Sequence, residues 1–103
     1  MLKNKTALIT GASRGIGRAI ATMYAEHGSN IAFTYINEDD EAHELTKLLQ
    51  TKGVQVLCIK SDAANFDAAH EVVRQVIDTF GSLDILVCNA GITRDTLLMR
   101  MSE

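Results

Sequence analysis

The chain has 103 residues, of which 47% are hydrophobic and 22% charged, with a formal net charge of −3. That length provides one small domain with a single core, and the charges lack the Lys/Arg clustering that nucleic-acid or anionic-membrane partners require. No stretch approaches the roughly 18 apolar residues of a membrane span, and Gly11 comes too early for a signal peptide, so we expect a cytoplasmic protein.

Apolar periodicity in the first part of the chain predicts a strand, a helix and a second strand. The first strand covers residues 6–10 and is short and apolar. Gly28 is the expected C-terminal cap of the helix at 16–27. The second strand covers 31–35. The helix has apolar residues at helical spacing, which are Ile16, Ala19, Ile20, Met23 and Tyr24.

The same alternation continues through the second part of the chain. The acidic run at 37–40 suits a helix start, and Gly53 ends that helix before a third strand at 54–59. The strand at 84–88 is apolar on both faces, as expected for a parallel strand covered by helices on both sides. Between these strands a helix runs to about residue 80, with an inward face of Ala69, Val72, Val73, Val76, Ile77 and Phe80.

These elements predict a single α/β domain over residues 1–103. Short connections between parallel strands require right-handed crossovers. The predicted fold is a Rossmann-like parallel sheet of strand order 3-2-1-4, with helices on both faces and truncated after strand 4. Ligands of such sheets bind at the carboxyl ends of strands 1 and 4. Residues 92–103 look like the start of a further element.

Neither the cysteines nor the histidines predict a metal or redox site. Cys58 and Cys88 fall on strands 3 and 4, roughly 14 Å apart at ~4.8 Å per strand, whereas bridged Cα atoms lie within ~7 Å. We expect two separate buried thiols. His27, His43 and His70 lie on three different predicted helices without metal-ligand spacing, and we expect them to be solvated.

The stretch TGASRGIG at 10–17 places three glycines where the first strand leads into a helix. Unpaired first-turn N–H groups and the helix dipole make such a turn an anion site that suits a pyrophosphate. Gly11 would permit the tight turn, Gly15 the approach of phosphate oxygens, and Gly17 the close packing of helix on sheet. The alternative is a tight turn that only packs.

Residues near this turn favour NADP over NAD. An NAD site usually places a carboxylate about 20 residues after the glycine turn, where it binds the ribose 2′-OH. Tyr35 occupies that place, and Arg14 can pair with a 2′-phosphate. Ser13 adds a hydroxyl donor and Asn37 a further polar contact, whereas the acidic residues 38–40 work against this choice. The alternative is that Arg14 points to solvent.

The glycine spacing G-x-x-x-G-x-G, Asp62 after the third strand and CNAG at 88–91 resemble the N-terminal half of the short-chain dehydrogenase/reductase family. Within that family, ITRDTLLMRM at 92–101 is similar to the 3-oxoacyl-[acyl-carrier-protein] reductases of bacterial fatty-acid synthesis. The resemblance implies a parent enzyme, assembled as a homotetramer, that transfers hydride from NADPH to a 3-oxoacyl thioester. Cys88 departs from the family pattern, which usually has Asn there.

The resemblance also implies further cofactor contacts. Asp62 and Ala63 would line the adenine, and residues 89–92 would border the adenosine ribose and lead toward the nicotinamide. Alternatively, Asp62 only caps a helix and Asn89 only fastens the end of its strand. The candidate cofactor-binding residues are Gly11, Ser13, Arg14, Gly15, Ile16, Gly17, Tyr35, Asn37, Asp62, Ala63, Asn89, Ala90, Gly91 and Ile92.

No catalytic residue is assigned in this chain. The family uses a Ser and a Tyr with a Lys four residues later, but Gly28 follows Tyr24 at that offset and Asp39 follows Tyr35. We expect the cofactor-binding portion of a reductase that is not catalytically complete alone. Two alternatives stay open: a freestanding flavodoxin-like nucleotide-binding module, and a self-associating piece that dimerises through the open edge of strand 4.

Overall fold

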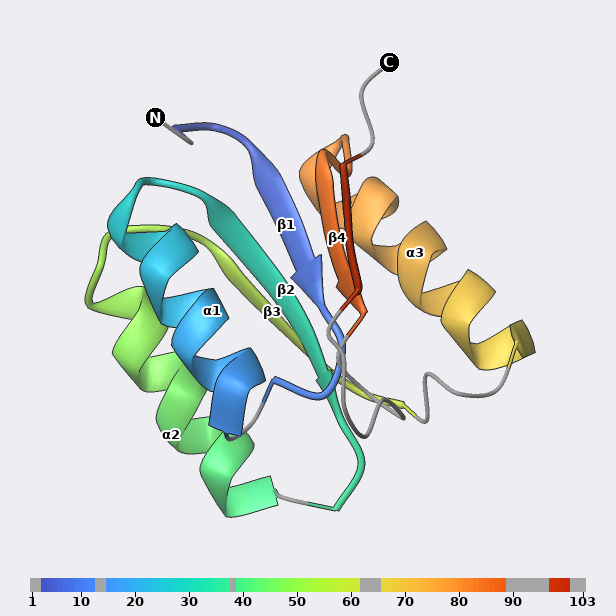
Figure 1. The fold of residues 1–103 in the computed structure, drawn as a ribbon, viewed down its shortest axis with the longest axis horizontal. Coiled ribbons are helices and arrows are strands. Elements are labelled where there is room, and N and C mark those ends of the chain that lie inside the picture. Colours follow the sequence, from blue (N-terminus) through green and yellow to red (C-terminus); the bar gives the residue numbers. More distant parts are fainter. Residues whose placement is uncertain (1–2, 13–14, 38, 62–65, 89–96, 101–103) are drawn as a thin grey trace.

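The computed structural model describes residues 3–12, 15–37, 39–61, 66–88 and 97–100, which form a five-stranded sheet of order β3-β2-β1-β4-β5. The strands are β1 (Thr6–Ile9), β2 (Asn30–Tyr35), β3 (Val56–Lys60), β4 (Ile85–Cys88) and β5 (Leu97–Arg100). Strands β1 to β4 pair in parallel, and their arrowheads point to the same end in Figure 1. The predicted α/β fold with order 3-2-1-4 is therefore confirmed.

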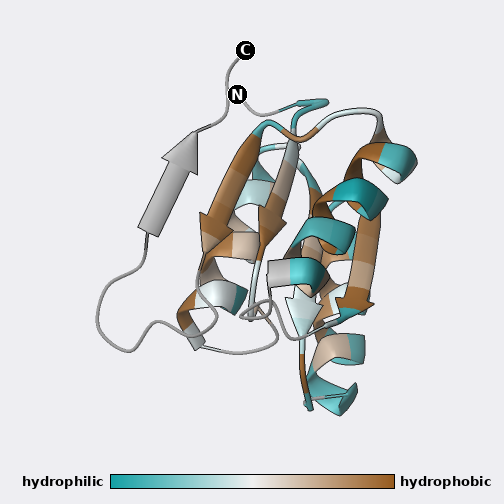
Figure 2. Ribbon diagram, turned by 90° about the vertical axis from the view of Figure 1, so that its right-hand side faces the viewer, coloured by the Kyte–Doolittle hydropathy of each residue, from teal (hydrophilic) through white to brown (hydrophobic). Residues whose placement is uncertain are grey.

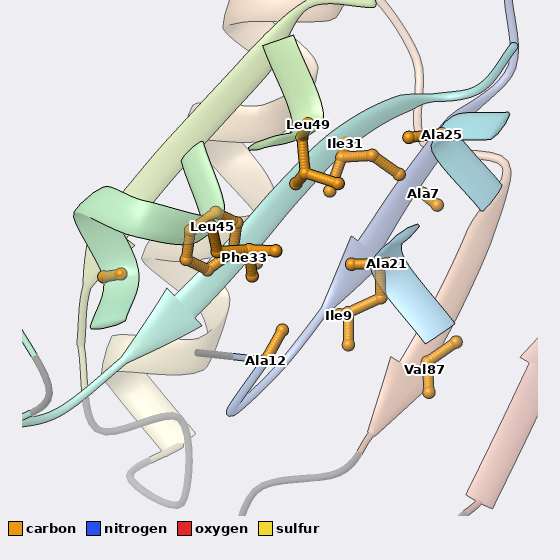
Figure 3. Close-up of a cluster of buried hydrophobic side chains, with 11 residues drawn as sticks. Ala7, Ile9, Ala12, Ala21, Ala25, Ile31, Phe33, Leu45, Leu49 and Val87 are labelled. Carbon is orange, nitrogen blue, oxygen red and sulfur yellow. The ribbon is translucent and has the colours of Figure 1, made fainter. Parts of the chain in front are cut away.

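Helices cover both faces of the sheet. α1 (Gly15–Glu26) and α2 (Asp39–Gln50) lie on one face, and α3 (Phe66–Phe80) lies on the other (Figure 1). Phe33 belongs to the larger apolar cluster, beneath α1 and α2 (Figure 3), and Leu8 belongs to the smaller cluster beneath α3. Because both of its faces are buried, the centre of the sheet consists of continuous apolar strands, which are mostly brown in Figure 2.

The first helix ends as the sequence predicts. Gly28 has a φ of +94° and donates its N–H to the carbonyl of Ala25 at 3.0 Å. Ser29 then donates its N–H to the carbonyl of Tyr24 at 3.1 Å. These bonds satisfy the last carbonyls of α1 and turn the chain into β2.

The face of α1 that meets the sheet differs from the predicted one. Two of the large residues expected to face inward, Ile16 and Met23, are 65% and 47% exposed. The residues that α1 buries are instead small, namely Gly17, Ala21 and Ala25, and Figure 3 shows the two alanines over β1. Small side chains let a helix approach a sheet closely, so the start of α1 is held near the end of β1.

A fifth strand covers the sheet edge that the sequence left open. β5 pairs antiparallel with β4, with Cα partners from Ile85↔Arg100 to Cys88↔Leu97. The expectation that the sheet is truncated after strand 4 is therefore wrong, and the open edge on which the self-association alternative depended is paired. The flavodoxin-like alternative is also wrong, because that fold places strand 1 between strands 2 and 3, whereas β1 lies between β2 and β4.

The cysteines and histidines occupy the places expected of them with one correction. Cys58 and Cys88 are free and lie on strands separated by two others, as predicted, but each is half-buried and not buried. β3 is an edge strand and β4 lies one strand from the opposite edge, which explains the partial exposure. His27, His43 and His70 are exposed, as predicted. No helix in the described ranges is long and apolar enough to cross a membrane.

Candidate functional site

Hydrogen bonds to two neighbouring strands hold the turn after β1. Gly11, with a φ of +66°, donates its N–H to Thr34 Oγ1 at 3.0 Å, and Ala12 donates its N–H to the Thr34 carbonyl at 3.1 Å. On the other side, Thr10 donates its N–H to the carbonyl of Val87 at 3.0 Å. The turn is thus fixed to both β2 and β4, and the amides of Gly11 and Ala12 already have partners within the protein.

The start of α1 provides the amides that a bound anion can use. The first turn of an α-helix leaves N–H groups without an intrahelical partner, and these groups bind anions together with the helix dipole. The first turn of α1 has no acidic residue, whereas α2 begins with three carboxylates and α3 has Asp67. Carboxylates there offset the positive end of the dipole. Of these helices, α1 is therefore the one whose N-terminus keeps its attraction for a negatively charged ligand.

The glycines of this helix start have different structural roles. Gly15 is exposed with a φ of +67°, and no heavy atom lies within 4 Å of the position a Cβ would take. Gly17 belongs to the buried face of α1 that packs on the sheet. Ile16, between them, is directed toward solvent. One glycine leaves the outer surface of the turn open, and the other lets the helix lie close to the sheet.

The carboxyl ends of β2 and β3 continue the same edge of the sheet. Tyr35 and Lys60 are Cα partners at the last position of these strands, and Ser61 donates its N–H to the carbonyl of Tyr35 at 2.9 Å. Tyr35 is half-buried and Asn37 is exposed. Lys60 Nζ lies 3.4 Å from Oδ1 of Asp39, the first residue of α2.

Two ionisable side chains at this edge have raised pKa values. Burial raises the pKa of the Tyr35 phenol, the neighbouring Cys58 and Asp39 raise it further, and Lys60 lowers it in part. Burial also raises the pKa of the Cys58 thiol, and a hydrogen bond with Thr46 acts in the opposite direction. Both groups are therefore protonated and uncharged at neutral pH, so neither adds negative charge beside the turn.

The raised pKa predicts slow alkylation of Cys58. Because the thiolate is the reacting form, the half-maximal rate with iodoacetamide is expected at a higher pH in the folded chain than in the same chain in urea. Peptide mapping by mass spectrometry, which separates Cys58 from Cys88, measures this difference. An equal pH dependence in the folded and unfolded chains would contradict the prediction.

The structure gathers part of the predicted site along one sheet edge. The predicted residues that lie there are Gly11, Gly15, Ile16, Gly17, Tyr35 and Asn37. The other predicted site residues lie outside the described residues, and they are Ser13, Arg14, Asp62, Ala63, Asn89, Ala90, Gly91 and Ile92. In the part of the chain that the structure describes, no group of three His, Cys, Asp or Glu side chains could hold a metal ion.

Sequence reasoning missed Thr34, which organises the glycine turn. Its side chain is buried at 1% exposure, and both its hydroxyl and its carbonyl accept turn amides. The signal was a hydroxyl group at the inner end of an otherwise apolar strand, because a buried hydroxyl requires a hydrogen-bond partner. The identity of that partner depends on the pairing of β1 with β2, which spacing along the chain does not specify.

A parallel sheet of this order, with a glycine turn that leads into an anion-attracting helix start, defines a Rossmann-type domain. Residues 5–103 match the short chain dehydrogenase family, and the chain belongs to that family.

Three relatives illustrate how far the likeness extends. The chain is 49% identical over 100 residues to the 3-oxoacyl-[acyl-carrier-protein] reductase FabG of Staphylococcus epidermidis, covering 97% of this chain and 41% of that protein. A short chain dehydrogenase from Burkholderia cenocepacia in complex with NADP has a TM-score of 0.85 and 42% identity, over 90% of this chain and 38% of that one. A short chain dehydrogenase from Mycobacterium paratuberculosis bound to NAD has a TM-score of 0.83 and 31% identity, over 89% and 38%. The chain therefore spans about two fifths of the length of these relatives.

Proposed function

We propose that this chain is the NADPH-binding N-terminal portion of a 3-oxoacyl-[acyl-carrier-protein] reductase. The observation that carries the proposal is the turn after β1, whose exposed Gly15 leaves room beside a helix start without carboxylates. A diphosphate there would accept hydrogen bonds from the first-turn amides of α1. The likeness to FabG over 41% of its length supports the choice of parent enzyme.

In this proposal NADPH supplies the hydride, and the residues of this chain bind and orient the dinucleotide. The turn and the start of α1 would hold the diphosphate, and the ends of β2 and β3 would hold the adenosine ribose. Arg14 would pair with the 2′-phosphate. The catalytic Ser, Tyr and Lys, the acyl-carrier-protein substrate site and the homotetramer would belong to the whole parent enzyme, because the family's Tyr and Lys spacing does not occur in residues 1–103.

Arg14→Ala tests the cofactor and its selectivity together. Isothermal titration of the wild-type chain should show tighter binding of NADPH than of NADH. The variant should lose about tenfold in NADPH affinity, the size of one charge-assisted hydrogen bond, with little change for NADH. The matched control is Arg74→Ala, which removes an arginine from the exposed face of α3 on the other side of the sheet and should leave both affinities unchanged. Equal losses of NADPH and NADH affinity in Arg14→Ala would overturn the 2′-phosphate role, and a wild-type chain that binds neither would overturn the proposed function.

A further inference from the structure

Lys60 is a cation at the sheet edge where the proposed function places the adenosine ribose. It ends β3 directly beside Tyr35, the last residue of β2. Side chains alternate along a strand, so Lys60 lies on the same face as Cys58, which packs against the cluster beneath α1 and α2. That face is also where α2 begins, and Lys60 Nζ approaches Asp39 Oδ1 there.

The ion pair between Lys60 and Asp39 is loose. The separation of 3.4 Å exceeds the roughly 2.7–2.9 Å of a charge-assisted hydrogen bond. The side chains are 57% and 54% exposed, and exposed pairs of this kind contribute little to stability. A doubly charged phosphate can therefore draw the ammonium away from the carboxylate at small cost.

Without this lysine the same edge would repel a phosphate. Asp39, Asp40 and Glu41 form the acidic first turn of α2, while the phenol of Tyr35 is uncharged. Lys60 is the cation that offsets this turn among the described residues at the ends of β2 and β3. Its removal would also free the Asp39 carboxylate to accept a hydrogen bond from a ribose 2′-OH, as the acidic residue of an NAD site does.

We propose that Lys60 is a specificity-determining residue that leaves Asp39 to bind the 2′-phosphate of NADPH, and that Asp39 opposes this choice. The inference rests on the proposed function, since it assigns a ligand group to the same site. It adds a second cation to Arg14 and gives the two members of one ion pair opposite effects on the choice between NADPH and NADH.

The test is isothermal titration of the 103-residue chain with NADPH and with NADH, after circular dichroism has shown that each variant is folded. Lys60→Gln should weaken NADPH binding about threefold to fivefold, in the range of exposed charge pairs, and leave NADH binding equal or tighter. Asp39→Asn should strengthen NADPH binding about twofold on the same scale. In the double variant the two effects should partly cancel.

The matched control is a second ion pair at the opposite edge of the sheet. Lys52 Nζ lies 3.4 Å from Glu26 Oε2, and Lys52→Gln should leave the ratio of the two affinities unchanged. If Lys60→Gln changes both affinities equally, or no more than Lys52→Gln does, the role of Lys60 is overturned while the proposed function stands. If the wild-type chain binds neither dinucleotide, the proposed function is overturned and this inference with it.

Discussion

Replacing Gly15 with alanine is expected to lower the affinity of the chain for NADPH by about tenfold to a hundredfold, the loss of one charge-assisted hydrogen bond to the diphosphate. A methyl group at this position enters the open space beside the start of α1, where the phosphate oxygens would lie. The φ of +67° also disfavours any residue with a Cβ. Isothermal titration with NADPH measures the change.

Gly81→Ala is the matched control for this experiment. Gly81 also has a positive φ, +86°, and no atom within 4 Å of a Cβ position, but it follows α3 at the opposite edge of the sheet. Both variants should therefore lose similar stability, by about 1–2 kcal/mol from the backbone strain. If the two variants also lost NADPH affinity equally, strain and not the blocked anion site would be responsible.

Phe33→Ala is expected to reduce the free energy of unfolding by about 3–5 kcal/mol. Phe33 is fully buried on β2, and in Figure 3 it lies beneath Leu45 of α2. Truncation removes an aromatic ring and leaves a cavity that the flanking strands cannot close. Since small domains are stable by only about 5–15 kcal/mol, urea unfolding should show a much lower midpoint.

Two further variants keep the Phe33 prediction open to contradiction. Phe33→Leu retains most of the volume and should cost about 1–1.5 kcal/mol, so it reports on the site even if the alanine variant does not fold. Ile77→Ala removes a side chain that the sequence predicted to face inward but that is 45% exposed on α3, and it should change stability by no more than about 0.5 kcal/mol. A larger loss for Ile77→Ala than for Phe33→Leu would contradict the described core.

Periodicity and connection length were sufficient to predict the parallel sheet and its strand order. Strands that are apolar on both faces must be buried on both faces, and short crossovers of fixed hand leave few ways to order them. The positions of the glycines likewise predicted the turn after β1 and the cap at Gly28, because each position needs a backbone conformation that other residues rarely adopt.

The face of α1 and the pairing of β5 depended on information that local patterns do not contain. Hydrophobic size favoured Ile16 and Met23 as the inner face, but the close approach of α1 to β1 selects Gly17, Ala21 and Ala25. β5 forms only because β4 offers an edge for antiparallel pairing, and no periodicity within residues 97–100 indicates that partner. The candidate site divides in the same way: the glycines could be read from their spacing, whereas the partners of Thr34 and Lys60 come from other strands.

The last residues of β2 tie three connections of the chain to one strand. The Thr34 hydroxyl and carbonyl accept the amides of Gly11 and Ala12, and the Tyr35 carbonyl accepts the amide of Ser61. A slip of β2 by one residue would turn Thr34 to the opposite face of the sheet and would detach the loops after β1 and β3 at the same time. The alignment of this single strand therefore sets the distance between the two ends of any elongated ligand that lies across the sheet edge.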